Sequence, residues 1–362
     1  MTDPKNYIIK DGVLRRYHGS QTTLIIPAGI TGIGRRAFDH SNVQELILSD
    51  EVTDIEEEAF RYCYALETVF ISKSVTRFGA LAFADCYRLK SFSVDEGNPY
   101  YDSRGDSHAV IDTQSNTLLF GGASTVIPDS VSSIGNNAFR GNESLQRMVI
   151  PASVKTIGRS AFAGCSRLEE VILCEGLQRI GDLAFNGCAM EKIIIPDSVI
   201  RLDNTTFFAC HHLSATINTE NIRELGNGVF GRCKSIKLID RKRSLSTVTR
   251  GNRAFFVRGF MEDYLNYPED TRLEYVDYLR EHREYFLKEL TVSAATARCF
   301  AALALIEKSE IDDLLEAAQK NGKSEIVAIL LEYAKETFGA ATAAYLESLH
   351  LEDEDDQTED EE

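Results

Sequence analysis

The chain has 362 residues, of which 43% are hydrophobic and 26% are charged, as is typical of a soluble protein with two or three domains. The formal net charge of −17 argues against nonspecific binding to nucleic acid or to an anionic membrane, because both repel acidic surfaces. No apolar run reaches the length of about 18 residues that a membrane span needs, and no signal-peptide pattern stands at the N-terminus. We therefore expect a cytoplasmic protein, with the cell surface as the alternative.

Residues 1–23 predict a β-hairpin. Asp11-Gly12 lies between two β-prone runs, and Asp-Gly is a strong signal for a tight hairpin turn. Because a stack of repeats must cover the apolar end of its first turn, we interpret this hairpin as an N-terminal cap.

A repeated motif, I-G-x-x-A-F-x-x-C-x-x-L-x-x-V-x-L, follows over residues 24–240. An apolar residue stands five positions before the Phe of each copy and a small residue three positions after it. The gaps between these Phe residues are 22 or 23 residues, except for one gap of 56. The Phe positions are Phe38, Phe60, Phe83, Phe139, Phe162, Phe185, Phe207 and Phe230. This period predicts an α/β repeat fold, a leucine-rich-repeat solenoid of about eight turns. We expect each turn to contain a strand, a loop, and a short helical or 3-10 segment that carries the Phe.

Six of the eight cysteines occupy one position of the repeat. They are Cys63, Cys86, Cys165, Cys188, Cys210 and Cys233, and Ser41 and Asn142 stand in the equivalent place of the other two copies. Side chains at equivalent positions of a stack point the same way, so we expect reduced, buried thiols rather than disulfides.

The long gap contains an insertion over about residues 95–125, which reads as turn, strand, turn and strand. We expect a β-hairpin island that projects from the stack. Its turn carries Arg104-Gly105-Asp106, the tripeptide that integrins recognise. Because Gly-Asp is also ordinary turn chemistry, we favour a structural role for it.

Together these segments resemble the bacterial BspA-like leucine-rich-repeat family. The resemblance rests on the repeated motif, on the cap with Asp11-Gly12-Val13-Leu14 and on the island with Gly97-Asn98-Pro99-Tyr100-Tyr101. It implies a curved right-handed solenoid with a binding role, and it does not imply a particular ligand.

Three further segments complete the chain. Residues 241–262 are rich in arginine and predict a basic linker that docks on the solenoid or, alternatively, contacts nucleic acid, which we disfavour. Residues 263–351 have helical periodicity, and residues 317–331 resemble the helical half of an ankyrin repeat, so we expect a small all-α, ankyrin-like domain. Residues 352–362 contain nine carboxylates and predict a disordered acidic tail.

Catalytic and metal-binding patterns are scarce in the sequence. Cys210-His211-His212 is the only local group of metal-type ligands, and the repeat pattern buries Cys210, whereas a zinc site needs about four converging ligands. The chain has no phosphate-binding loop, nucleophile elbow or zinc-protease motif. We predict a protein that is not an enzyme and that uses no cofactor or metal.

The side chains that point outward from the predicted strands form the surface that says most about function. Strand alternation predicts an exposed apolar row on the concave face with Ser93 and Thr216 as polar breaks, and a second row beside it. The predicted partner-binding residues are Ile47, Phe70, Val149, Ile172 and Ile194, with Glu45, Arg147, Glu170 and Lys192. A contiguous apolar stripe on an open sheet is typical of a binding surface. We predict a scaffold that binds a protein partner there. The alternatives are a surface adhesin that also uses Arg104-Gly105-Asp106, and a sensor whose helical domain carries an activity.

Overall fold

The computed structural model describes residues 4–351, and the chain divides into two compact units. Within the described residues, the first comprises 4–236 with Thr249–Asn252, and the second comprises Lys237–Val248 with 253–351. The predicted acidic tail, 352–362, lies outside the described residues. Each unit is described by itself.

The first unit begins with the predicted hairpin. After a 3-10 turn, η1 (Pro4–Asn6), β1 (Tyr7–Lys10) pairs with β2 (Val13–Tyr17) in antiparallel fashion. Asp11 and Gly12 both have positive φ, at 54° and 74°, as a type I′ turn requires. β2 then pairs in parallel with the first short strand of the solenoid. This confirms the hairpin and shows how it covers the end of the stack.

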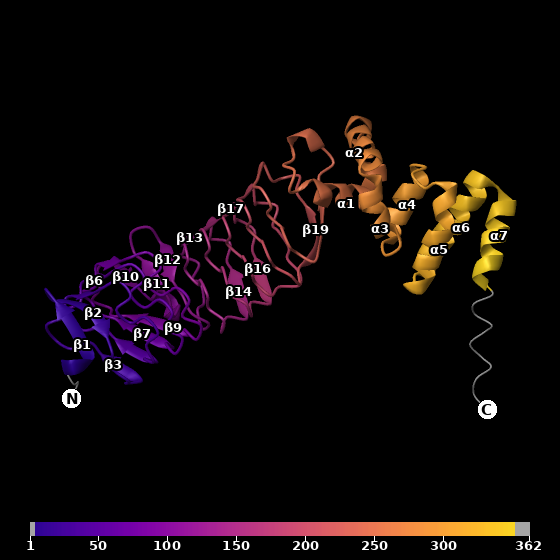
Figure 1. Cartoon of the computed structure of the whole chain (residues 1–362). Coiled ribbons are helices and arrows are strands. Elements are labelled where there is room, and N and C mark those ends of the chain that lie inside the picture. The colour runs from indigo at the N-terminus through magenta and orange to yellow at the C-terminus, as the bar shows by residue number, and fades with distance from the viewer. Residues whose placement is uncertain (1–3, 352–362) are drawn as a thin grey trace, which may run out of the picture. The chain divides into compact units, whose positions relative to one another are not determined.

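Each turn of the solenoid contributes to one or both of two faces, which lie along the lower and upper sides of the unit in Figure 1. The long-strand face contains β3 (Thr23–Ile25), β5 (Glu45–Ile47), β7 (Thr68–Ile71), β9 (Ser91–Val94), β14 (Arg147–Ile150), β16 (Glu170–Leu173), β19 (Ser214–Asn218) and β21 (Ser235–Ile239), in which the boundary between the units falls. The short-strand face contains β4 (Gly32–Ile33), β6 (Asp54–Ile55), β8 (Arg77–Phe78), β13 (Ser133–Ile134), β15 (Thr156–Ile157), β17 (Arg179–Ile180), β18 (Arg201–Leu202) and β20 (Glu224–Leu225).

The repeat Phe side chains fill the core between the two faces, as the periodicity predicts. All eight are buried. They form two stacked series, Phe38 to Phe83 and Phe139 to Phe230, in which neighbouring ring centroids lie 4.8–5.3 Å apart. Because each ring lies against the ring of the next turn, no turn buries its apolar side chains alone.

The Ile-Gly-x-x-Ala-Phe segments differ from our expectation of helical or 3-10 structure. Each begins with a short strand and continues as a series of hydrogen-bonded turns. The residues two positions before and two positions after every repeat Phe have a φ between 52° and 78°. A left-handed residue cannot continue a helix, so the chain turns sharply on both sides of the Phe and brings it into the core.

The insertion also differs from our expectation, because it does not project from the stack. It forms β10 (Tyr101–Asp102), a 3-10 turn, η2 (Arg104–Asp106), β11 (Val110–Asp112) and β12 (Thr117–Phe120). β10, β11 and β12 are antiparallel neighbours, and β12 pairs in parallel with β13. The island thus repeats the arrangement of the N-terminal cap and starts a second short-strand sheet.

The turns on either side of the island still stack directly at their loops. The backbone N–H of Asp85 donates to the carbonyl of Arg140 over 2.9 Å, and the carbonyl of Tyr87 accepts from the N–H groups of Glu143 and Ser144. The island therefore interrupts the short-strand sheet but leaves the loop edge of the solenoid continuous.

The second unit is helical within its described part. Its helices are α1 (Arg253–Asp263), α2 (Glu269–Glu281), α3 (Arg283–Leu290), α4 (Ala294–Ala302), α5 (Ile311–Lys320), α6 (Ser324–Phe338) and α7 (Ala340–Leu351), with 3-10 turns η3 (Leu245–Thr247), η4 (Tyr264–Asn266) and η5 (Lys308–Glu310). Residues 241–262, which we expect to be a linker, contain η3 and most of α1, because Phe256 and Phe260 are buried and bring the segment into the core of this unit. Gly322, with a φ of 64°, ends α5 as the Asn-Gly pair predicts. The ankyrin likeness remains a prediction.

Candidate interaction surfaces

The N-terminal part of the predicted apolar row lies in register on the long-strand face. Ile47 pairs with Phe70, and Phe70 pairs with Ser93. Ile25 of β3, which we did not predict, extends the row because it pairs with Ile47 and is exposed. Ile47 and Phe70 are half-buried, so this part of the face presents only a partial apolar surface.

The C-terminal part of the row is more exposed. Val149 pairs directly with Ile172, and their exposed fractions are 40% and 38%. Ile194 follows with an exposed fraction of 83%. It lies on no strand, however, unlike our expectation.

The second predicted row carries charges beside the apolar one. Glu45 pairs in register with Thr68 and accepts a hydrogen bond from the hydroxyl of Thr23. Arg147 and Glu170, in register on β14 and β16, form an exposed ion pair with an N–O distance of 2.8 Å. Such a pair adds little to stability and leaves both groups available to a partner.

A hollow of about 640 Å³ borders the C-terminal part of the row. Its lining residues are Glu169, Glu170, Val171, Ala189, Glu191, Lys192 and His212. Two of the predicted residues, Glu170 and Lys192, therefore lie together at one concavity. The shallow shape and polar lining suit a partner side chain better than an enclosed small molecule.

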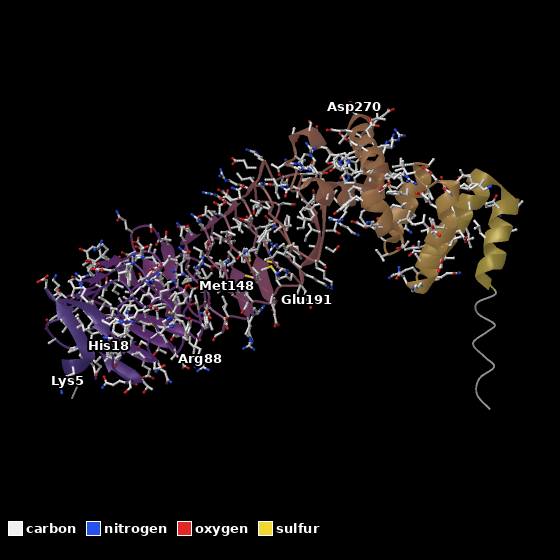
Figure 2. The ribbon with its side chains drawn as sticks, viewed as in Figure 1. Lys5, His18, Arg88, Met148, Glu191 and Asp270 are labelled. Carbon is white, nitrogen blue, oxygen red and sulfur yellow. The ribbon has the colours of Figure 1, made fainter. Side chains whose placement is uncertain are left out.

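A second concavity was not predicted from the sequence. It crosses the loops of five successive turns and has a volume of about 420 Å³; we call it the rim groove. Its lining residues are His40, Ser41, Asn42, Tyr64, Ala65, Tyr87, Arg88, Glu143, Ser144 and Arg167. These loops lead into the long strands, and Arg88 of this groove and Glu191 of the first hollow lie along the lower edge of the solenoid in Figure 2.

Aromatic rings form a ladder at the N-terminal end of the rim groove. The ring of His40 lies 5.3 Å from that of Tyr64, which lies 4.7 Å from that of Tyr87. Tyr62 stacks beside them, with its ring centroid 5.7 Å from His40. Tyr64 is 38% exposed, although its ring lies within 6.0 Å of the rings of His40, Tyr62 and Tyr87.

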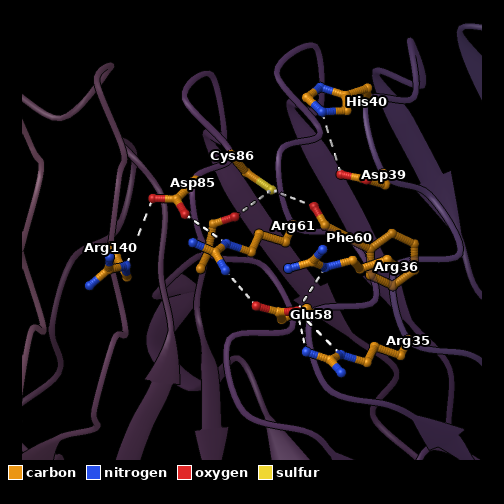
Figure 3. A network of polar contacts seen from close by, with 11 residues as sticks. Arg35, Arg36, Asp39, His40, Glu58, Phe60, Arg61, Asp85, Cys86 and Arg140 are labelled. Atoms are coloured by element: carbon orange, nitrogen blue, oxygen red, sulfur yellow. Dashed lines mark hydrogen bonds and ion pairs between the residues drawn. The ribbon is translucent and has the colours of Figure 1, made fainter.

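The same turns carry a network of charged side chains, which Figure 3 shows together with His40. Glu58 is buried and accepts hydrogen bonds from Arg35, Arg36 and Arg61. Arg61 also donates to Asp85 over 3.0 Å, and its guanidinium lies 4.5 Å from the centre of the Tyr62 ring. These hydrogen bonds, first of all the one from Arg36, lower the pKa of Glu58 to about 2. Through Arg61, the network contacts the ring of Tyr62.

The sequence does contain a signal for the rim groove. Tyr64 and Tyr87 stand four positions after consecutive repeat Phe residues, and His40 and Tyr62 stand two positions after theirs. Aligning the copies of the repeat by these loop positions, rather than by the strand positions, would have identified the ladder.

The structure separates the members of the Cys210-His211-His212 group. Cys210 is buried and donates its thiol hydrogen to the carbonyl of Phe185. His211 is exposed and forms a hydrogen bond with the carbonyl of Arg232, and His212 lines the hollow described above. Within residues 4–351, no group of three or more His, Cys, Asp or Glu side chains is arranged to hold a metal ion.

Two further sequence candidates make contacts within their own units. The guanidinium of Arg104, in the Arg-Gly-Asp turn, donates to Asp102 and Asn116 over 2.8 Å each. Among the basic residues of 241–258, Arg241 pairs with Asp263 and Arg258 with Glu289. These contacts favour structural roles for both segments.

The family comparison agrees with this geometry. A model of the BspA-type leucine-rich-repeat region matches residues 9–104 and 123–257 in six copies. The chain belongs to the BspA-type leucine-rich-repeat family. The unmatched residues 105–122 are the central part of the island, which departs from the repeat pattern.

Two solved bacterial structures are among those to which this chain is similar. A leucine-rich cell surface protein from Faecalibacterium prausnitzii is 25% identical with a TM-score of 0.53, and the match covers 63% of this chain and 62% of that one. The pneumococcal vaccine antigen PcpA is 18% identical with a TM-score of 0.39, over 60% and 67% of the two chains. The chain thus spans less than two thirds of the Faecalibacterium protein. No curated protein matches it.

The helices of the described part are too short or too polar to cross a membrane.

Proposed function

We propose that this BspA-type protein is a non-catalytic scaffold that binds a protein partner on its long-strand face. The observation that carries the proposal is the exposed apolar group formed by Val149, Ile172 and Ile194, beside the Arg147–Glu170 ion pair and the hollow that contains Lys192. An apolar centre with a charged rim is the usual composition of a protein interface. The smaller group of Ile47 and Phe70, with Glu45, extends the same face.

The family supports this proposal in a general way. Leucine-rich-repeat proteins commonly act by contact with other proteins, and repeat solenoids offer extended surfaces for that purpose. The adhesin alternative through Arg104-Gly105-Asp106 has less support, because the guanidinium of Arg104 is held by two neighbouring side chains.

Which proteins this chain can bind depends on whether it lies in the cytoplasm or at the cell surface. All eight cysteines are unpaired, which is typical of a reducing compartment and supports the cytoplasm. The Faecalibacterium relative is described as a cell surface protein, which supports the exterior. Fractionation of the native cell, with immunodetection of the intact chain, distinguishes the two locations.

Site-specific photo-crosslinking tests the binding face. A photoreactive residue at position 172 should capture a discrete partner in the native cell, whereas the same residue at position 200 should not. Ile200 is a matched control because it is also 38% exposed but directly precedes β18 of the short-strand face. Ile172→Asp should abolish the crosslink from position 149 and leave thermal unfolding unchanged. Equal capture from positions 172 and 200, or capture that survives Ile172→Asp, would overturn the proposal.

A further inference from the structure

We propose that the rim groove binds an extended, proline-rich peptide segment that carries acidic residues. This binding site is separate from the long-strand face, because its lining comes from the loops that precede the strands. The inference therefore does not depend on the function proposed above.

The spacing of the aromatic ladder matches a polyproline II helix. His40, Tyr64 and Tyr87 stand on three consecutive turns. The Tyr64 ring centroid lies 5.3 Å from that of His40 and 4.7 Å from that of Tyr87, so the first and third rings are at most about 10 Å apart. A polyproline II helix rises about 3.1 Å per residue and returns to the same face every third residue, after about 9.3 Å. Two prolines three residues apart can therefore contact the His40 and Tyr87 rings together.

The chemistry of the groove also fits this ligand. Grooves lined by aromatic rings recognise proline-rich segments because such segments are extended before binding and lose little conformational entropy. The peptide carbonyls of a polyproline II helix accept no internal hydrogen bonds and need donors. Asn42 supplies an exposed side-chain amide, which makes no hydrogen bond within the described part of the chain.

The charges at the other end of the groove favour acidic flanks. Arg88 and Arg167 are exposed and, among the described residues, make no ion pair, while Glu143 is the one acid in the lining. Some exposed cations elsewhere on the same solenoid pair across turns, as in Lys90–Glu67 and Arg147–Glu170. A ligand carboxylate would give the two arginines the partners that the protein does not supply.

Addition of a β-strand is a poorer explanation of this groove. The backbone groups along its floor are already used between turns: the N–H groups of Glu143 and Ser144 donate to Tyr87, and the amide side chain of Asn142 donates to the carbonyl of Leu89. Side chains, rather than free backbone groups, therefore provide the contacts. The rings of His40, Tyr64 and Tyr87 pack against one another, which restricts their motion and lowers the entropic cost of binding.

Selection from peptide libraries tests this inference directly. The full chain is presented to a displayed library with a fixed Pro-x-x-Pro core and random flanks, and to a second library in which alanine replaces both prolines. We expect enrichment from the first library only, with Asp and Glu favoured in the flanks. The double variant Tyr64→Ser/Tyr87→Ser should bind the selected peptides at least about ten-fold more weakly, as loss of an interface hot spot does.

Two controls separate the outcomes. Tyr100→Ser removes a tyrosine that is 50% exposed but lies on the island, outside the groove, and it should bind as the unaltered chain does. The charge reversal Arg88→Glu/Arg167→Glu should shift the selected flanks from acidic to basic. The inference is overturned if neither library enriches, if both enrich equally, if the Tyr64→Ser/Tyr87→Ser variant binds as well as Tyr100→Ser, or if only oligosaccharides or oligonucleotides bind in a Tyr64-dependent manner.

Discussion

The thiol of Cys165 donates a hydrogen bond to the backbone carbonyl of Phe139, which lies 26 residues earlier in the chain and 3.1 Å away. Each of the other five repeat cysteines donates in the same way to the carbonyl of the repeat Phe of the preceding turn. The pairs are Cys63 with Phe38, Cys86 with Phe60, Cys188 with Phe162, Cys210 with Phe185 and Cys233 with Phe207. The repeat cysteines are therefore free thiols that link consecutive turns by hydrogen bonds, in addition to packing in the core.

Removing one of these thiols should weaken the stack locally. Cys165→Ala deletes the sulfur, leaves the Phe139 carbonyl without this donor and creates a small cavity, so we expect the free energy of unfolding to fall by about 1–2 kcal/mol. Cys174→Ala is the matched control, since Cys174 is half-buried and lies outside the repeat position. Urea titration followed by far-UV circular dichroism measures both. Equal losses in the two variants would contradict the role assigned to the hydrogen bond.

The buried thiols should make stability depend on pH under alkaline conditions. Burial raises the pKa of the Cys165 thiol to about 12, whereas an unfolded cysteine ionises near pH 8.5. Because the folded pKa is the higher one, the contribution is complete below about pH 8.5 and is lost as the pH rises toward 12, by about 1.4 kcal/mol per pH unit. The slope of unfolding free energy against pH should be shallower in Cys165→Ala. An unchanged slope would show that this thiol does not titrate on unfolding.

The Glu58 network should contribute stability at neutral pH and lose it in acid. Hydrogen bonds from Arg36, Arg61 and Arg35 lower the pKa of Glu58 to about 2, so its contribution is complete above its ordinary pKa of 4.5 and is lost as the pH falls toward 2. Glu58→Gln should cost about 2 kcal/mol at pH 7, because a buried amide cannot replace the carboxylate for three arginines.

Hydrogen exchange of peptides around residues 56–64 measures this effect. Exchange in Glu58→Gln should accelerate at pH 7 in these turns, and the neighbouring control Glu57→Gln should leave exchange unchanged because Glu57 is exposed. Matching exchange rates for the two variants would indicate that the network does not stabilise these turns.

Gly79, four positions before Phe83, should be intolerant of a side chain. A Cβ added at Gly79 would lie 2.2 Å from the backbone nitrogen of Glu57 on the preceding turn. Gly79→Ala should therefore force the turns apart and cost about 3 kcal/mol. Gly187 has a φ of 72° but has no atom within 4 Å of an added Cβ, so Gly187→Asn should cost less than about 1 kcal/mol. Thermal unfolding ranks the two, and a smaller loss for Gly79→Ala would disprove the close approach.

The sequence by itself determined the solenoid and its core. Phe recurs at a fixed period, and a period near 22 residues leaves each turn with an apolar side that only its neighbours can cover. Strand alternation likewise placed Ile47 opposite Phe70 and Val149 opposite Ile172, because side chains on a strand alternate with a period of two. The Asp11-Gly12 hairpin was predictable because its turn chemistry is local.

Only the tertiary structure decided how distant segments meet. The island joins the sheet because β12 finds an open edge in β13, and α1 forms within the predicted linker because Phe256 and Phe260 become buried. The rim groove brings together His40, Tyr87 and Arg167 from turns whose loops stack, although they are far apart in the chain. The periodicity of the sequence predicts which side chains of one turn are buried. Which side chains of different turns contact one another depends on how closely the backbones of those turns approach.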